Sequence, residues 1–261
     1  MELFDNIAPV TVNNFLNYVR SGRYNGTVVH RSEPGFVIQG GWLRFDEAAF
    51  NFVTVNTDPN IANEFMLSNT RGTLAMAKVG GDPNSANSQW FINLANNSFL
   101  DSDNGGFTVF GRVMENGMAV VDAIAQLPRA IIAANSPFPV INFNGVTLTN
   151  SNLVNVSMAV LAPNYFDNAT GTLRVTVDAG TAGKAALSFS VVSTAPAVVI
   201  QLNLASVVAL TQSVDKIATF DLNTGRLLLP ELVVNGAVAF RNVRFRLSDA
   251  NLLLFTLESF E

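Results

Sequence analysis

The stretch VVHRSEPGFVIQGG, residues 28–41, decides how the whole chain is interpreted. It begins with β-branched residues, continues through Pro34-Gly35 and ends in a second apolar run. Because proline fixes φ and glycine can adopt positive φ, this dipeptide is typical of a tight turn between two strands. Arg31 precedes the turn and Gln39 follows it. The sequence therefore predicts a β-hairpin with an arginine on one strand and a glutamine on the other.

The same stretch resembles the signature of the cyclophilin family of peptidyl-prolyl isomerases, F-H-R-x-x-x-x-F-x-x-Q-G-G. The matching residues are Val29-His30-Arg31, Phe36 and Gln39-Gly40-Gly41. The resemblance covers roughly the first 160 residues, a usual size for one domain. It implies a mainly β fold, an eight-stranded antiparallel barrel capped by two helices. The other matching segments are Glu2-Leu3-Phe4-Asp5, Ala8-Pro9, Thr11-Val12, Asn14-Phe15, residues 71–77, 88–93 and 109–113.

The chemistry of such an enzyme concerns the X-Pro amide, whose rotation barrier is about 18–20 kcal/mol because the nitrogen lone pair is conjugated with the carbonyl. A guanidinium that donates to the proline nitrogen binds the twisted amide more strongly than the planar one, without proton transfer. Arg31 matches the family's catalytic arginine. Gln39 could accept a hydrogen bond from Arg31 and donate one to the substrate carbonyl. Phe36 completes the predicted catalytic set and, with Phe91 and Leu100, forms the expected proline pocket.

The resemblance also implies a set of residues that line the groove and two departures from the family pattern. Lys78 stands where asparagine is frequent, and its backbone would pair with an extended peptide. Phe99 and Phe107 stand where many members have tryptophan and histidine, and such replacements are common in bacterial-type members. Because that tryptophan contacts cyclosporin in the family, Phe99 implies weak cyclosporin binding. The remaining groove residues are Val37, Ala77 and Gln89.

Each of these residues also has a plain structural interpretation. Phe36 and Phe91 could be core side chains, Arg31 a surface ion-pair residue and Gln39 a solvated strand position. The combined motif favours a site. His30 is expected on the opposite face from Arg31, as a satisfied structural histidine. A serine triad is disfavoured because no G-x-S-x-G elbow is present. The competing hypothesis is a binding or scaffold protein that only holds proline-containing segments.

Composition limits the other function classes. The 261 residues are 49% hydrophobic and 13% charged, which is enough apolar material for two domains with real cores. The net charge of −5 and the absence of a basic run disfavour nucleic acid as a partner. The chain has no cysteine and one histidine, so we predict no disulfide, no ordinary N/S metal site and no cofactor. No apolar segment is long enough to span a bilayer, and no charged region followed by an apolar core indicates targeting.

Along the first domain, hydrophobic spacing predicts a helix that begins at Ala8-Pro9 and ends near Gly22, and a second helix that stops at Pro128. Residues 44–63 have no clear period and are interpreted as a long loop, and residues 129–150 as an irregular connection. Residues 1–4 match only the second half of the family's first strand, so we expect part of that strand to be missing. The predicted strands are residues 26–30, 35–39, 72–77, 89–94, 107–113 and 153–161.

The boundary is placed at Ala162-Pro163, which divides the chain into an isomerase domain, 1–162, and an accessory domain, 163–261. Apolar runs separated by Asn, Gly and Thr turns predict an all-β, sandwich-like accessory domain or a small barrel. A weak repeat relates Phe166-Asp167-x-x-Thr170-Gly171-x-Leu173 to Phe220-Asp221-x-x-Thr224-Gly225-x-Leu227. It is interpreted as one hairpin turn used twice, with calcium binding as the alternative.

The expected partners of residues 1–162 are proline-containing peptides and unfolded proteins. Residues 163–261 are either an adhesion or partner-binding module or a structural appendage that supports a homodimer. Their low lysine content and Asn/Thr-rich turns are typical of exported proteins, so a periplasmic or extracellular location is predicted, with the cytoplasm as the alternative.

Overall fold

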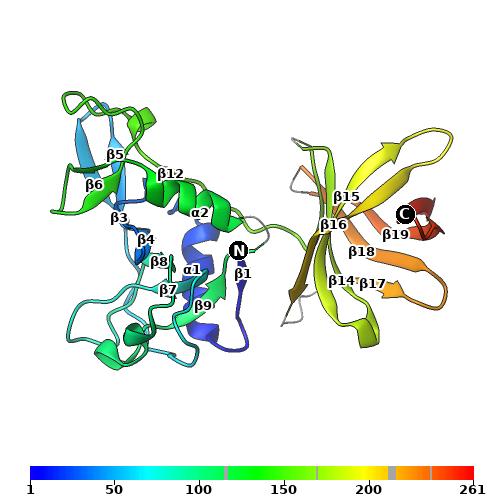
Figure 1. Ribbon diagram of the computed structural model, residues 1–261, viewed down its shortest axis with the longest axis horizontal. Helices are drawn as coiled ribbons and strands as arrows, with labels where there is room; N and C mark the ends of the chain where they lie inside the picture. The colour runs from blue at the N-terminus through cyan, green and yellow to red at the C-terminus, as the bar shows by residue number, and fades with distance from the viewer. Residues whose placement is uncertain (115–116, 169, 211–215, 236) are drawn as a thin grey trace. The chain divides into compact units, whose positions relative to one another are not determined.

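The computed structural model describes residues 1–114, 117–168, 170–210, 216–235 and 237–261. The chain divides into two compact units, Met1–Val160 and Leu161–Glu261 (Figure 1). Each unit has its own hydrophobic core, and each is described separately below.

The first unit is built on two antiparallel sheets that share the segment 27–33. One sheet runs in the order β1-β9-β7-β8-β4-β3 and the other in the order β12-β2-β5-β6. This mainly β arrangement confirms the predicted fold class. The strands are β1 (Glu2–Leu3), β2 (Thr27–Val28), β3 (Arg31–Glu33), β4 (Val37–Gly40), β5 (Leu43–Asp46), β6 (Asn51–Thr54), β7 (Thr73–Met76), β8 (Trp90–Asn93), β9 (Val109–Arg112) and β12 (Asn155–Val156).

Helix α1 (Pro9–Arg20) has the predicted start, with proline in its first turn. It ends in a Schellman motif, in which Gly22 has φ +68° and donates to the Val19 carbonyl while Arg23 donates to the Tyr18 carbonyl. Helix α2 (Gly117–Gln126) buries Val121 and Ala125. Both helices pack against the same core.

That core is rich in aromatic rings. Phe15 of α1 lies 5.2 Å from Tyr24 and 5.1 Å from Phe110, measured between ring centroids. Trp90 lies so close to the backbone of Gly40 that a Cβ at that glycine would sit 2.6 Å from an indole carbon. The first glycine of the Gln-Gly-Gly motif is therefore required by close packing of β4 against the indole.

Three local predictions were wrong in this unit. The expected loop 44–63 contains the end of β5 and all of β6. Residues of β5 alternate between buried and exposed positions, as in a strand with one face on the core. In the turn between β5 and β6, the Asp46 carboxylate accepts hydrogen bonds from the amides of Ala48 and Ala49. The expected connection 129–150 contains a ribbon of β10 (Arg129–Ile131) and β11 (Pro137–Pro139). The predicted strand 153–161 is reduced to β12.

Short 3₁₀ turns complete the helical elements: Ser98–Asp101, Asp103–Gly105 and Asn150–Asn152 in the first unit and Gly180–Ala182 in the second. The first turn contains Phe99 and Leu100, and Phe107 follows two residues after the second.

The second unit is all-β, as predicted, and its sheet closes on itself. The order is β13-β14-β15-β16-β20-β19-β18-β17, and β13 also pairs with β18 while β17 pairs with β14. Of the two alternatives, sandwich and small barrel, this pairing corresponds to the barrel. The strands are β13 (Asn164–Asp167), β14 (Thr172–Asp178), β15 (Lys184–Ser193), β16 (Val199–Leu210), β17 (Ala218–Asp221), β18 (Arg226–Val234), β19 (Ala237–Asp249) and β20 (Leu254–Ser259).

The sequence repeat corresponds to two equivalent hairpins, β13–β14 and β17–β18. In each, a threonine hydroxyl donates to an aspartate carboxylate over 2.8 Å, Thr170 to Asp167 and Thr224 to Asp221. The glycine that follows has φ +66° in both copies. These bonds support the hairpin-turn interpretation of the repeat.

Candidate active site

The candidate site is centred on the hairpin of β3 and β4. Arg31 and Gln39 are directly opposed in the antiparallel pair, and the turn between the strands closes with a hydrogen bond from the Phe36 amide to the Glu33 carbonyl. The Arg31 Nη1 donates to Gln39 Oε1 over 3.2 Å, and Gln39 Nε2 donates to Gln89 Oε1 over 2.8 Å. Arg31, Gln39 and Gln89 therefore form one chain of hydrogen bonds. It runs from β3 across β4 to the residue just before β8.

A fourth member of this chain, Glu33, was missed by the sequence analysis. Its Oε1 accepts from Arg31 Nε over 2.8 Å and lies 2.6 Å from Nη2. Alternation along a strand places residues 31 and 33 on one face, so the spacing was the signal that could have revealed the pair. The guanidinium is thus held between a carboxylate and an amide oxygen.

An apolar cluster adjoins the arginine. Phe91, Leu100 and Val37 are buried in it, while Phe36 and Phe107 are partly exposed at its border. The Arg31 guanidinium carbon lies 5.5 Å from the centre of the Phe36 ring. The structure therefore brings the predicted pocket residues Phe36, Phe91 and Leu100 together beside the arginine, with Val37 beneath them.

Phe99 and Phe107 extend this cluster in different ways. Phe99 stacks on Phe36 at 5.6 Å and is 59% exposed, so most of its ring faces solvent. Phe107 meets Phe91 edge to face at 5.8 Å. Phe99 therefore offers surface to a large ligand, whereas Phe107 mainly supports the ring below it.

Lys78 lies beside Phe107 rather than projecting freely. Its Nζ donates to the carbonyls of Asn104 (2.8 Å) and Gly106 (2.7 Å) and sits 4.7 Å above the Phe107 ring. Burial lowers the pKa of its ammonium group from the ordinary lysine value. The neighbouring Ala77 uses its own amide to donate to the Gln89 carbonyl. Lys78 therefore ties the 3₁₀ segment to the end of β7.

A buried asparagine network lies under the cluster, and the sequence analysis did not identify it. Asn97 donates to the Phe36 carbonyl over 3.0 Å and to Asn93 Oδ1 over 2.8 Å, and Asn69 donates to the Phe107 carbonyl over 3.0 Å. All three asparagines are nearly or fully buried. Asn93 Nδ2 donates in turn to Asn69 Oδ1 over 3.2 Å. The network therefore connects the backbones of Phe36 and Phe107.

His30 is buried, and its ring lies edge to face with Trp42 at 5.4 Å. Burial lowers its pKa to about 4, and the neighbouring Arg31 charge adds to the effect. Hydrogen bonding to the Gln89 side chain and to the Val28 backbone acts on this pKa in the opposite direction. The ring is therefore held by packing and by polar contacts, as expected for a structural histidine.

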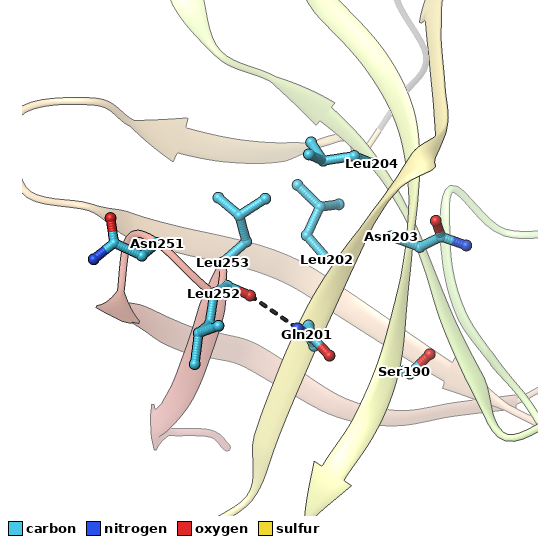
Figure 2. Close-up of a pocket in the computed structure, with 8 residues that line it drawn as sticks. All are labelled: Ser190, Gln201, Leu202, Asn203, Leu204, Asn251, Leu252 and Leu253. Atoms are coloured by element: carbon cyan, nitrogen blue, oxygen red, sulfur yellow. Dashed lines mark hydrogen bonds between the residues drawn. The ribbon is translucent and has the colours of Figure 1, made fainter.

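The second unit carries a surface pocket of about 440 Å³ (Figure 2). Leu202 and Leu204 come from β16, and Leu252 and Leu253 from the turn between β19 and β20; Gln201 Nε2 donates to the Leu252 carbonyl over 3.0 Å. Leu204 and Leu252 are 66% and 56% exposed. The sequence analysis named no residue of this pocket.

The described residues show no cluster of three or more His, Cys, Asp and Glu side chains that could hold a metal ion. In the same part of the chain, no helix has the length and apolar character that crossing a bilayer requires.

The first unit is thus a mainly antiparallel β structure in which an arginine–glutamine pair lies beside an apolar aromatic cluster. The sequence model of the cyclophilin type peptidyl-prolyl cis-trans isomerases matches residues 1–142. The chain therefore belongs to this family, which confirms the predicted family and the assignment as a peptidyl-prolyl isomerase.

Two curated relatives agree with this assignment. A peptidyl-prolyl cis-trans isomerase of Acinetobacter baylyi is 43% identical over 143 residues, which cover 53% of this chain and 72% of the relative. Peptidyl-prolyl cis-trans isomerase B of Escherichia coli is 46% identical over 129 residues, 48% of this chain and 76% of the relative. A cyclophilin-type isomerase of Cryptosporidium parvum, solved in the presence of the dipeptide Ala-Pro, is 28% identical with a TM-score of 0.41 and covers 52% of this chain and 82% of that chain.

Proposed function

We propose that Arg31 accelerates X-Pro rotation by donating a hydrogen bond to the proline nitrogen of the twisted amide. The observation that carries this proposal is the placement of its guanidinium, fixed by Gln39 at 3.2 Å and adjacent to the Phe36 ring. As the amide twists, the nitrogen becomes pyramidal and recovers its lone pair, so the bond strengthens in the transition state. No proton has to be transferred.

In this mechanism Gln39 and the apolar cluster orient the substrate. Gln39 Oε1 is occupied by Arg31, which leaves its Nε2 to divide its two hydrogens between Gln89 and the substrate carbonyl. Phe36, Phe91 and Leu100 receive the proline ring, and removing these apolar surfaces from water contributes to binding. Within the described residues the Lys78 backbone makes no main-chain hydrogen bond, so it is open to an extended peptide.

The test is the rate of cis-to-trans exchange of a proline-containing peptide in a protease-coupled assay of the full-length protein. Arg31→Ala should reduce turnover by about two orders of magnitude while peptide affinity changes by less than about three-fold, because the contact is made mainly in the twisted state. Arg31→Lys should restore little, since an ammonium cannot reproduce the planar fork. Near-normal turnover of Arg31→Ala would refute the mechanism, and wild-type exchange no faster than buffer would favour the non-catalytic binding protein.

We further propose that the site accepts proline-containing segments of unfolded proteins and that it binds cyclosporin weakly. The weak binding of cyclosporin is supported by Phe99, which offers a broad apolar ring but lacks the N–H donor of an indole.

For the second unit, we propose self-association through the pocket of Leu202, Leu204, Leu252 and Leu253. Its support is the exposure of Leu204 and Leu252, since adjacent exposed apolar side chains are typical of interaction surfaces. Light scattering should report a dimer for the full chain and a monomer for Leu204→Asp. Leu222→Asp, which changes an exposed leucine in the turn between β17 and β18, is the matched control and should stay dimeric. A monomeric wild type would exclude the proposal and leave the partner-binding alternative.

The low lysine content also supports an exported protein, so we propose a periplasmic or extracellular location. Fractionation of cells that express the natural gene would test it, and recovery in the cytoplasm alone would rule it out.

A further inference from the structure

The carboxylate of Glu33 engages one edge of the Arg31 guanidinium, while Gln39 engages Nη1. A guanidinium has five N–H donors. The contacts to Glu33 occupy the Nε donor and one on Nη2, and the contact to Gln39 occupies one on Nη1. Two donors remain, one on each terminal nitrogen. These are the donors that a substrate amide can use.

The backbone holds Glu33 in place for this contact. Residues 31 and 33 of β3 are partly exposed on one face, whereas the intervening Ser32 is buried on the other. The carbonyl of Glu33 accepts from the Phe36 amide over 2.9 Å and thereby closes the turn. The carboxylate therefore extends from a defined part of the hairpin, beside a guanidinium that sits at the end of a long, flexible side chain.

We propose that Glu33 is a positioning residue: it orients the Arg31 guanidinium so that its two remaining N–H groups face the substrate amide. This inference rests on the catalytic role proposed for Arg31. The carboxylate also opposes catalysis, because it reduces the net positive charge near the proline nitrogen. The Arg31 and Glu33 side chains are 34% and 42% exposed, so water screens this electrostatic effect. Orientation is therefore the larger effect, and loss of the carboxylate lowers the rate.

Three full-length variants separate orientation from other roles, with kcat and KM measured over a range of peptide concentrations. Glu33→Ala should lower kcat about ten-fold and change KM by less than about two-fold, because a misaligned catalytic group affects the transition state more than the ground state. Glu33→Gln keeps an acceptor oxygen and should retain kcat within about three-fold of wild type. Asp122→Ala, which removes the carboxylate that pairs with Arg71 at 2.7 Å, is the matched control and should leave both constants unchanged.

The ¹⁵N-labelled arginine side chains give an independent readout. The Nε–H signal of Arg31, assigned by its loss in Arg31→Ala, should exchange slowly with water in the wild type and rapidly in Glu33→Ala. In the Arg31→Ala background, Glu33→Ala should cause no further loss of turnover, because no guanidinium is left to position. An equal further loss would indicate a structural role and overturn the inference.

The remaining outcomes are also decisive. A raised KM at unchanged kcat in Glu33→Ala, especially for peptides that contain lysine, would assign Glu33 to substrate recognition instead. Loss of turnover in Arg31→Ala with unchanged kcat in Glu33→Ala would overturn the positioning role alone. Near-normal turnover of Arg31→Ala would remove the proposed function itself.

Discussion

At the scale of single residues, the contacts of a side chain decide its role more than its identity does. Lys78 was expected as a groove residue, yet its ammonium group donates to the Asn104 and Gly106 carbonyls and covers the Phe107 ring. Its three donors suit this task, because two carbonyl oxygens and a ring face can be contacted at once. The residue thus stabilises the segment 104–107 beside the apolar cluster.

Phe99 offers a direct test of inhibitor recognition. A net hydrogen bond contributes about 0.5–1.5 kcal/mol, so Phe99→Trp should tighten cyclosporin binding by roughly ten-fold. Turnover should change little, since the exposed Phe99 ring is stacked on Phe36 and is not in contact with Arg31 in the described interactions. Calorimetric titration of both proteins measures the difference. Equal affinities would show that Phe99 does not determine inhibitor binding.

His30 makes stability depend on pH. Its folded pKa of about 4 lies below the ordinary value of 6.5, so the unfolded chain binds the proton more readily between these values. The contribution of His30 to the free energy of unfolding should therefore be nearly constant above about pH 7.5 and fall by about 3 kcal/mol as the pH is lowered to 4.

Urea unfolding at several pH values between 7 and 5 avoids the range in which most carboxylates titrate, and over this range His30 should lower the free energy of unfolding by about 2 kcal/mol. Because the chain contains one histidine, its imidazole NMR signals need no assignment. A titration midpoint near pH 6.5 in the folded protein would contradict the expected shift.

At the scale of elements, helix α1 shows how a distant residue completes a local structure. The residue before the helix, Ala8, has no side chain that can cap it. Instead the Glu64 carboxylate accepts from the amides of Val10 (3.2 Å) and Thr11 (2.8 Å) and from the Thr11 hydroxyl (2.8 Å). A carboxylate at this end also interacts favourably with the helix dipole.

Glu64→Ala should therefore lower the free energy of unfolding by about 1–2 kcal/mol, the usual effect of losing an N-terminal cap. Urea denaturation measures this loss. Glu64→Gln should lose less stability than Glu64→Ala, because the amide oxygen of glutamine can still accept a hydrogen bond. The control is Asp122→Ala, which removes the exposed ion pair between Asp122 of α2 and Arg71. It should lower the free energy of unfolding by less than about 1 kcal/mol. Equal effects of the two alanine variants would argue against capping.

At the scale of the whole molecule, the second unit contains an internal two-fold relation. Strands β13–β16 and β17–β20 pair in the same order, and β16 meets β20 antiparallel with Ile200 opposite Phe255. The parallel pairs β13–β18 and β14–β17 are equivalent under the same relation. Both halves contribute to one core.

Equivalent core positions should thus respond alike to truncation. Leu173 and Leu227 follow the turn glycines of the two repeats and are both buried. Leu173→Ala and Leu227→Ala should each destabilise the second unit by about 2–5 kcal/mol, within about 1 kcal/mol of one another. Thermal unfolding measures this, and isomerase turnover at 25 °C serves as the control that should not change. A large effect at only one position would show that the halves are not energetically equivalent.

Residues 28–41 by themselves determined the hairpin, because turn chemistry and strand alternation act over a few neighbouring residues. The family resemblance of the same stretch predicted Arg31, Phe36 and Gln39 as site residues. It also located helix α1, since the apolar spacing and Gly22 are local signals. For the second unit, apolar runs and repeated turns were enough to predict an all-β structure.

Only the tertiary structure decided the contacts that join distant residues. The Glu64 cap and the asparagine network connect segments far apart in the chain, and their partners are selected by packing rather than by periodicity. The β5–β6 hairpin and the closure of the second sheet depend on which faces find buried partners. The Glu33–Arg31 pair is close in sequence, but strand alternation leaves the side-chain rotamers free, so its formation depends on Gln39 and Phe36 constraining the arginine from the other sides.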